Sequence, residues 1–188
     1  MGAPMAKNLL KQGFDLSCCD ANPEALIAFE GIAKSVSTSP EKEARDRNVI
    51  ITMLPTSNIV EEVLFGDNGA LNTIDQESLI IDMSTASYEQ SMHIAARLKY
   101  LGHKFIDAPV GRTPREAISG DLLVMAGGEA EDVETAKDIF QAVANKIIHV
   151  GPTGSGLKAK LVNNYMAMVN NAVTGETLSF ASRVGLNI

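Results

Sequence analysis

The sequence predicts an α/β protein in which helices cover a mostly parallel β-sheet. Three observations support this prediction. Short apolar runs, such as Asn48–Leu54, alternate along the chain with longer segments that have helical periodicity. Most of these short runs are apolar at successive positions, which is typical of strands buried on both faces of a sheet. Strand and helix also follow one another in turn, which is the order of βαβ units.

The helices and strands can be placed in order from their periodicity and their end signals. A helix over Ala3–Gly13 has apolar residues at helical spacing and ends at a glycine. The helix over Asn22–Glu30 begins with asparagine, a favoured N-cap, and has proline at its first position. Further helices are predicted over Ser57–Leu64, Ser87–Leu101, Ala130–Ala144 and about Ser155–Val184. Strands are predicted over Phe14–Asp20, Asn48–Leu54, Leu79–Met83, Lys104–Val110, Leu122–Ala126 and Ile147–Val150, and a loop over Gly111–Gly120.

Length and composition limit the class of protein. The 188 residues suit one domain, or one domain and part of another. Hydrophobic residues make up 45% and charged residues 21%, so the chain can bury a core. A net charge of −7 without a Lys/Arg block argues against nucleic acid as a partner, and mildly against an anionic membrane. No apolar run approaches the ~20 residues of a spanning helix, and no signal-peptide pattern is present.

The cysteines and histidines indicate neither a disulfide nor a metal site. Cys18 and Cys19 are neighbours on a predicted strand, so their side chains point to opposite faces. Reduced thiols and a cytoplasmic location are therefore expected. His93, His103 and His149 are dispersed along the chain without the spacing of metal ligands.

The first residues suggest the end of a dinucleotide-binding turn. In a Rossmann-like fold, a Gly-rich turn leads from the first strand into the first helix and presents N–H groups to a pyrophosphate. Gly2 lies where the third glycine of that turn would be, and Asp20 ends the next strand 18 residues later. An acidic residue there would bind the adenosine ribose and repel a 2′-phosphate. The alternative interpretation is an ordinary helix–strand unit with a turn aspartate.

Both ends of the sequence suggest a chain that is truncated. The first strand and the two earlier glycines of the turn have no counterpart before Gly2. At the other end, Gly185–Ile188 has the character of a helix end that leads into more protein. The expected fold is therefore a doubly wound sheet without its first strand, followed by a long helix.

The segment Gly154–Asn164 combines a lysine and an amide at the start of an apolar helix. Lys160 and Asn164 are four residues apart, so they project from one helix face and could hold a small polar substrate between them. A lysine that faces a pocket loses hydration, which lowers its pKa and suits it to proton transfer. The alternative is a solvated helix lysine, as expected for Lys158, which points elsewhere.

Five motifs follow one another in a characteristic order. They are Met1-Gly2-Ala-Pro-Met-Ala, Met53-Leu54-Pro55, Asp82-Met-Ser84-Thr85, Asp107-Ala-Pro-Val110 followed by Gly127-Gly128, and Gly156-x-x-x-Lys160-x-x-Asn163-Asn164. This series resembles the β-hydroxyacid dehydrogenase family, which includes 3-hydroxyisobutyrate dehydrogenase and tartronate semialdehyde reductase. The resemblance covers all 188 residues, which correspond to the front two-thirds of a family member.

The resemblance implies two domains and an NAD-dependent oxidoreductase. Residues 1–151 would form a Rossmann-like NAD(P)-binding domain, and residues 152–188 would begin an all-α C-terminal domain. Lys160 would give a proton to the alkoxide that forms when NADH reduces an aldehyde. Ser84 would be either a strand-end cap or a ligand. The residues implied to bind the cofactor are Met1, Gly2, Asp20, Leu54, Pro55 and Thr85, and those implied to bind substrate include Asn163 and Asn164.

One run departs from the usual family pattern. Most members have Ser-Gly-Gly after Asp-Ala-Pro-Val, whereas this chain has Gly111-Arg112-Thr113. An arginine there offers a planar, always charged fork that suits an oxyanion. The run is similar to the 3-sulfolactaldehyde reductase branch, so Arg112 and Thr113 would bind the sulfonate of an aldehyde that is reduced to 2,3-dihydroxypropane-1-sulfonate. Alternatively, Arg112 forms a surface ion pair with Glu116 or Asp121.

Other functions remain open at this point. The substrate could be a carboxylate, as in 3-hydroxyisobutyrate dehydrogenase or tartronate semialdehyde reductase, or the chain could be a non-catalytic scaffold of the same fold. Because scaffold members typically lose the lysine, Lys160 favours an enzyme. The resemblance also implies a homodimer or homotetramer for the full-length protein. The chain by itself is expected to bind NADH poorly, since it lacks the first strand and the last helices of the family.

Overall fold

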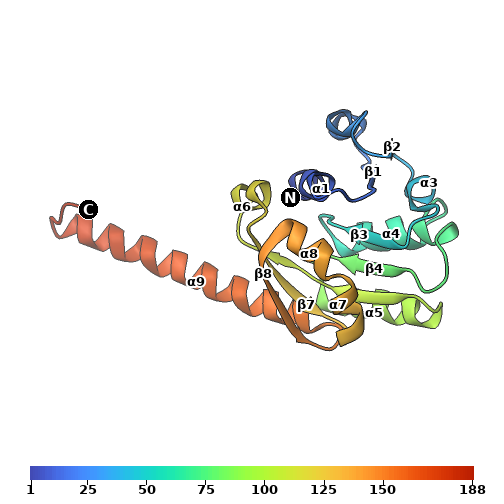
Figure 1. Cartoon of the computed structure of the whole chain (residues 1–188). Coiled ribbons are helices and arrows are strands. Elements are labelled where there is room, and N and C mark those ends of the chain that lie inside the picture. Colours follow the sequence, from blue (N-terminus) through green and yellow to red (C-terminus); the bar gives the residue numbers. More distant parts are fainter.

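The computed structural model describes residues 1–188 and has the α/β architecture that the sequence predicts (Figure 1). Its main sheet consists of β3 (Val49–Thr52), β4 (Leu79–Asp82), β5 (Lys104–Asp107), β6 (Val110–Gly111), β7 (Leu122–Gly127) and β8 (Ala144–Gly151). The strand order is β3-β4-β5-β7-β6, and β8 also pairs with β7. Neighbouring strands are parallel, except that β7 runs antiparallel to β5 and β6. The prediction of a mostly parallel sheet is confirmed.

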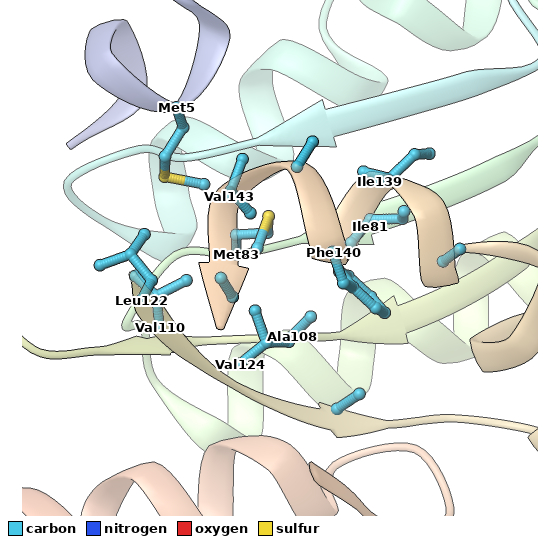
Figure 2. Packing of buried hydrophobic residues seen from close by; sticks show 14 of the residues in the cluster. Met5, Ile81, Met83, Ala108, Val110, Leu122, Val124, Ile139, Phe140 and Val143 are labelled. Atoms are coloured by element: carbon cyan, nitrogen blue, oxygen red, sulfur yellow. The ribbon is translucent and has the colours of Figure 1, made fainter. Parts of the chain in front are cut away.

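Helices cover both faces of this sheet, as strands without a polar face require. The core on one face receives residues from α1 (Gly2–Lys11), α6 (Pro114–Ser119), α7 (Ala130–Thr135) and α8 (Lys137–Val143). The core on the other face receives residues from α4 (Ser57–Phe65) and α5 (Tyr88–Tyr100). Consecutive residues of β4 enter different cores: Ile81 packs in the first, together with Phe140, and Ile80 packs in the second (Figure 2).

A smaller sheet lies apart from the main one. β1 (Ser17–Cys19) and β2 (Ser35–Ser37) pair in parallel, accompanied by α2 (Pro23–Leu26), η1 (Ile27–Phe29), α3 (Pro40–Ala44) and η2 (Ala70–Asn72). Two cavities of about 190 and 260 Å³ are each lined by residues of both β1 and β3, which do not pair with each other. Cys18 is buried and Cys19 is exposed, so the two free thiols point to opposite faces as predicted.

The prediction of a loop over Gly111–Gly120 is wrong, because this segment contains the helix α6. Thr113 and Glu116 form a capping box at its start: the Thr113 side chain accepts the N–H of Arg115, and the Glu116 carboxylate accepts the N–H of Thr113. Gly120 ends the helix in the left-handed conformation, with φ of 77°. These are ordinary helix end signals, so the helix follows from the local sequence.

Other boundaries also differ from the prediction. The strand predicted over Lys104–Val110 is divided into β5 and β6, since Pro109 between them has no N–H to donate to a neighbour. The helix predicted over Ala130–Ala144 is two helices, α7 and α8, and Ala144 already belongs to β8. β2 and α3 were not predicted, because elements of 3 and 5 residues are too short to show a period.

α9 (Ser155–Arg183) is the longest element, with 29 residues, and projects from the rest of the molecule (Figure 1). Its contacts with β5, β7 and β8 hold its first turns against the sheet. No residue of α9 after Lys160 is buried, and large apolar side chains such as Val162, Tyr165 and Phe180 are exposed along it. None of the helices is both long and apolar enough to cross a membrane. The direction of α9 therefore depends on its first turns.

The first turn of α9 lies so close to the sheet that only glycine fits at position 156. A Cβ atom on Gly156 would lie 2.3 Å from the carbonyl oxygen of Met125 and 2.5 Å from that of Asp107. Both neighbours are backbone atoms of strands, which cannot rotate away as a side chain can. This close approach fixes the distance between the helix and the strand ends.

We expect Gly156→Ala to lower the free energy of unfolding by roughly 1–3 kcal/mol, because the added methyl overlaps with backbone atoms. Gly175→Ala is the matched control, since Gly175 lies in the same helix and has no heavy atom beyond its own helix backbone within 4 Å of its Cβ position. It should be neutral or stabilising by about 0.5–1 kcal/mol, because alanine favours helix. Urea unfolding followed by circular dichroism measures both variants, and equal effects would contradict this account.

Candidate active site

The carboxyl ends of β3, β4 and β5 bring polar side chains into one row. Thr52 pairs in register with Asp82, and Asp82 with Asp107, across the three strands. Asp82 is 2% exposed and Asp107 is 1% exposed. Ligands of α/β sheets bind at this edge, so two buried carboxylates here need an explanation. Their partners differ, and so do their roles.

Asp82 joins the loops that follow β3 and β4. Its Oδ1 accepts the hydroxyl of Thr52 at 2.9 Å and the N–H of Ser84 at 3.0 Å. The Ser84 hydroxyl in turn accepts the N–H of Leu54 at 2.9 Å. Of the two roles considered for Ser84, the structure supports the strand-end cap, because its oxygen is buried in this network.

Asp107 joins the sheet to the start of α9. Its Oδ1 accepts the N–H of Gly154 at 2.5 Å, and its Oδ2 accepts the N–H of Leu157 at 2.8 Å. Both N–H groups belong to the helix start, where no intrahelical acceptor exists and where the helix dipole favours negative charge. Burial nevertheless raises the pKa of Asp107 to about 6, because desolvation outweighs these two hydrogen bonds and nearby Asp82 adds repulsion.

Glycine at position 127 leaves room for this carboxylate. A Cβ on Gly127 would lie 2.6 Å from Oδ1 of Asp107 and 2.6 Å from the backbone nitrogen of Gly156. Asp107 and Gly127 belong to one of the five sequence motifs, but the sequence predicted no individual role for either residue. The signal that could have indicated a role for Asp107 is an acidic residue at the end of a predicted buried strand. Its partners at the start of α9 gave no such signal, because they lie 47 and 50 residues away in the sequence.

Lys160 is buried one turn beyond this junction. It is 9% exposed, forms no ion pair, and has a pKa that burial lowers from its ordinary value. The expectation of a desolvated lysine is confirmed, and the alternative of a solvated one is wrong. Asn163 and Asn164 follow on the same helix and are half-buried. Lys158 is exposed, as predicted, and its ammonium lies 4.9 Å from the centre of the Tyr88 ring.

Three of the residues predicted to bind the cofactor lie around one cavity. Gly2, Asp20 and Leu54 line the space of about 190 Å³ next to α1. The Asp20 carboxylate, at the end of β1, is exposed and accepts the N–H of Asn22 at 2.9 Å. Met1 is the half-buried N-cap of α1. Pro55 and Thr85 are exposed and do not line this cavity.

The residues predicted to bind an anion lie at the start of α6. Arg112 is exposed, has φ of 78°, and donates a hydrogen bond to the carbonyl of Asp121. It forms no ion pair with Glu116 or Asp121, so that alternative is not found. Thr113 donates its hydroxyl proton to Glu116 at 2.6 Å, which leaves this side chain without a donor for an anion. Of the two residues predicted to bind an anion, Arg112 therefore offers the free donors.

The two apolar cavities do not bring these sets together. Neither of the two apolar cavities includes Lys160, Asn163, Asn164, Arg112 or Thr113 in its lining. The ligand roles assigned to these residues stay predictions. No group of three or more His, Cys, Asp or Glu side chains is arranged to hold a metal ion.

The raised pKa of Asp107 predicts a specific pH dependence. An unfolded aspartate has a pKa near 3.8, so between about pH 4 and pH 6 the folded chain binds more protons at this site. Stability from this group therefore falls as the pH rises through that window. The free energy of unfolding of the wild type, minus that of Asp107→Asn, should fall by roughly 2–3 kcal/mol between pH 4 and pH 7. Urea titrations of both proteins test this, and a difference that is constant or rises would contradict it.

Comparison with known proteins identifies the family. Residues 1–151 match the family described as the NAD binding domain of 6-phosphogluconate dehydrogenase. The chain is 40% identical to the 3-sulfolactaldehyde reductase of Escherichia coli (strain K12), over 99% of this chain and 62% of that protein. It is 35% identical to the mitochondrial 3-hydroxyisobutyrate dehydrogenase of Homo sapiens, over 100% of this chain and 56% of that protein.

The fold agrees with these sequence matches. The Mycobacterium tuberculosis 3-hydroxyisobutyrate dehydrogenase, solved with L-serine, superimposes with a TM-score of 0.92 at 31% identity, over 100% of this chain and 63% of that one. The chain thus spans about 60% of the length of the relatives that it matches. The resemblance to β-hydroxyacid dehydrogenases is confirmed, and the chain belongs to the family of NAD-binding domains described for 6-phosphogluconate dehydrogenase.

Proposed function

We propose that this chain supplies the cofactor-binding domain and the catalytic lysine of an NADH-dependent reductase of small anionic aldehydes. One observation carries the proposal: Lys160 is buried without a carboxylate partner, on a helix that is hydrogen-bonded to Asp107 at the carboxyl edge of the sheet. Burying an unpaired ammonium costs free energy, so a purely structural position would favour an apolar residue. A non-catalytic scaffold of the same fold would have no use for such a lysine.

The residues at the start of α1 fit a dinucleotide. Its N-cap, Met1, provides no side-chain cap, so the N–H groups of Gly2 and Ala3 are free to bind a phosphate. Asp20 stands beside the same cavity as Gly2, where its carboxylate would accept ribose hydroxyls. The same negative charge would repel a 2′-phosphate, which supports NADH over NADPH as the reductant.

Lys160 handles the proton in the proposed reaction. A bound nicotinamide supplies the hydride that reduces the carbonyl carbon. The Lys160 ammonium donates a hydrogen bond to the carbonyl oxygen and gives up its proton as negative charge develops there. Because burial lowers the pKa of Lys160, proton transfer is easier than from a solvated lysine. In the reverse direction the neutral amine accepts the proton of the alcohol.

The best substrate, on these grounds, is 3-sulfolactaldehyde. Arg112 has no carboxylate partner, and one hydrogen bond to Asp121 leaves most of its five N–H donors available to a sulfonate. The relative that is 40% identical carries the name of a reductase of this aldehyde. Carboxylate semialdehydes are the second candidate, because 3-hydroxyisobutyrate dehydrogenases are 35% identical and an arginine fork binds carboxylates as well.

Replacement of the lysine tests the proposed reaction. We expect Lys160→Ala to lower kcat roughly 10²–10⁴-fold, because the proton donor is lost. Lys158→Ala, two residues away on the exposed face, should change kcat only a few-fold. NADH oxidation would be followed with two proteins. The first is the 188-residue chain alone, and the second, the joined protein, is this chain fused to the part of the Escherichia coli reductase that it does not cover. The absence of turnover with every aldehyde offered to the joined protein, or full activity of Lys160→Ala, would overturn the proposal.

Replacement of the arginine tests the substrate. The joined protein would be offered 3-sulfolactaldehyde beside succinic, tartronate and methylmalonate semialdehydes. We expect Arg112→Ala to lower kcat/KM for the sulfonated aldehyde roughly 10–100-fold, the worth of a charge-assisted hydrogen bond. Arg115→Ala is the matched control, since Arg115 is equally exposed and lies three residues later, in α6. Equal or better use of a carboxylate aldehyde would favour the second candidate.

A further inference from the structure

The hydrogen bonds of Asp107 join two distant parts of the chain. Asp107 ends β5, whereas Gly154 and Leu157 begin α9, 47 and 50 residues later. These are the side-chain hydrogen bonds that connect the sheet to α9. Ordinary helices receive such a bond from the side chain of their own N-cap residue. Here the N-cap is Gly154, which has no side chain, so the sheet itself caps the helix.

Gly154 cannot be exchanged for a local capping residue. Its φ is 90°, in the left-handed region, and a Cβ there would lie 2.6 Å from the sulfur of Met92 and 3.0 Å from the Tyr88 ring. A serine or aspartate at this position would be strained and would collide with α5. The cap must therefore come from elsewhere, and the carboxylate that provides it also fixes where the helix begins relative to the strands.

Lys160 stands one helical turn from this cap. Leu157 and Lys160 are three residues apart, so they share a helix face and are separated by about 4.5 Å along the axis. Both are buried, Leu157 at 1% and Lys160 at 9% exposure. Any tilt or slip of the first turn therefore moves the Lys160 ammonium with it.

We propose that Asp107 is a positioning residue, whose hydrogen bonds to Gly154 and Leu157 hold the Lys160 ammonium in its buried place at the edge of the sheet. A role of this position in catalysis rests on the proposed function. The positioning itself does not, because it concerns only where Lys160 lies and how much water surrounds it.

Two variants separate positioning from general stability. Asp107→Asn keeps the size of the side chain but has one acceptor oxygen for two N–H groups. Asp82→Asn is the matched control, since Asp82 is equally buried, occupies the paired position on the next strand, and binds Thr52 and Ser84 rather than α9. Both substitutions disturb a buried carboxylate, and only the first loosens the helix.

The test uses the 188-residue chain and needs no turnover. Nuclear magnetic resonance of ¹³C-labelled lysine reports the pKa of Lys160, and amide hydrogen exchange reports the N–H of Leu157. In Asp107→Asn, we expect the pKa of Lys160 to rise toward its ordinary value as water reaches it. Exchange at Leu157 should become about tenfold faster or more, the equivalent of one hydrogen bond. Asp82→Asn should leave both signals as in the wild type.

A second variant guards against failure of the first to fold. Gly127→Ala leaves the carboxylate in place but sets a methyl 2.6 Å from Asp107 Oδ1 and 2.6 Å from the backbone nitrogen of Gly156, so it should disturb the same junction and shift Lys160 in the same direction. Unchanged Lys160 and Leu157 signals in these two variants, or equal changes in Asp82→Asn, would overturn the proposal. If the signals move as expected but the joined protein reduces no aldehyde, the proposed function fails while the positioning role holds.

Discussion

The structure depends on one junction, at which a buried carboxylate of the sheet accepts two N–H groups of a helix. Burial raises the free energy of the charged form of Asp107. The two hydrogen bonds and the helix dipole offset only part of this increase, as the pKa of about 6 indicates. An apolar pair would hold the layers together with less conflict. It would not, however, specify which helix residue meets which strand.

The two buried aspartates connect different parts of the chain at the edge of the sheet. Asp82 ties the loops after β3 and β4 to each other, and Asp107 ties β5 to α9. Glycines make the second connection possible, since Gly127 and Gly156 allow strand and helix backbones to approach more closely than any side chain would permit. The hydrogen bonds of Asp82 and Asp107 thus fix which residues of the loops and of α9 lie beside the strand ends. The two apolar cores on either side of the sheet provide the stability.

The sequence predicted what is local and periodic. The apolar runs of β4 and β5 followed from spacing alone, whereas spacing left open whether Lys160 is buried or solvated. The helix α6 could have been found, because Thr113 and Glu116 have the spacing of a capping box. β2 and α3 are too short for any period to appear. The partners of Asp107 could not be foreseen in the same way, because they come into contact only when residues far apart in the chain fold together.

The length of α9 turns its first turn into the fulcrum of a lever. At 1.5 Å per residue, its 29 residues extend about 43 Å, and only the first turns touch the sheet. A rotation of about 10° at the fulcrum would move the ammonium of Lys160 by about 1 Å but the far end of the helix by about 7 Å. Anything that docks on the distal helix can therefore exert a large torque on the first turn, and the position of Lys160 resists it through the stiffness of a few atoms around Asp107.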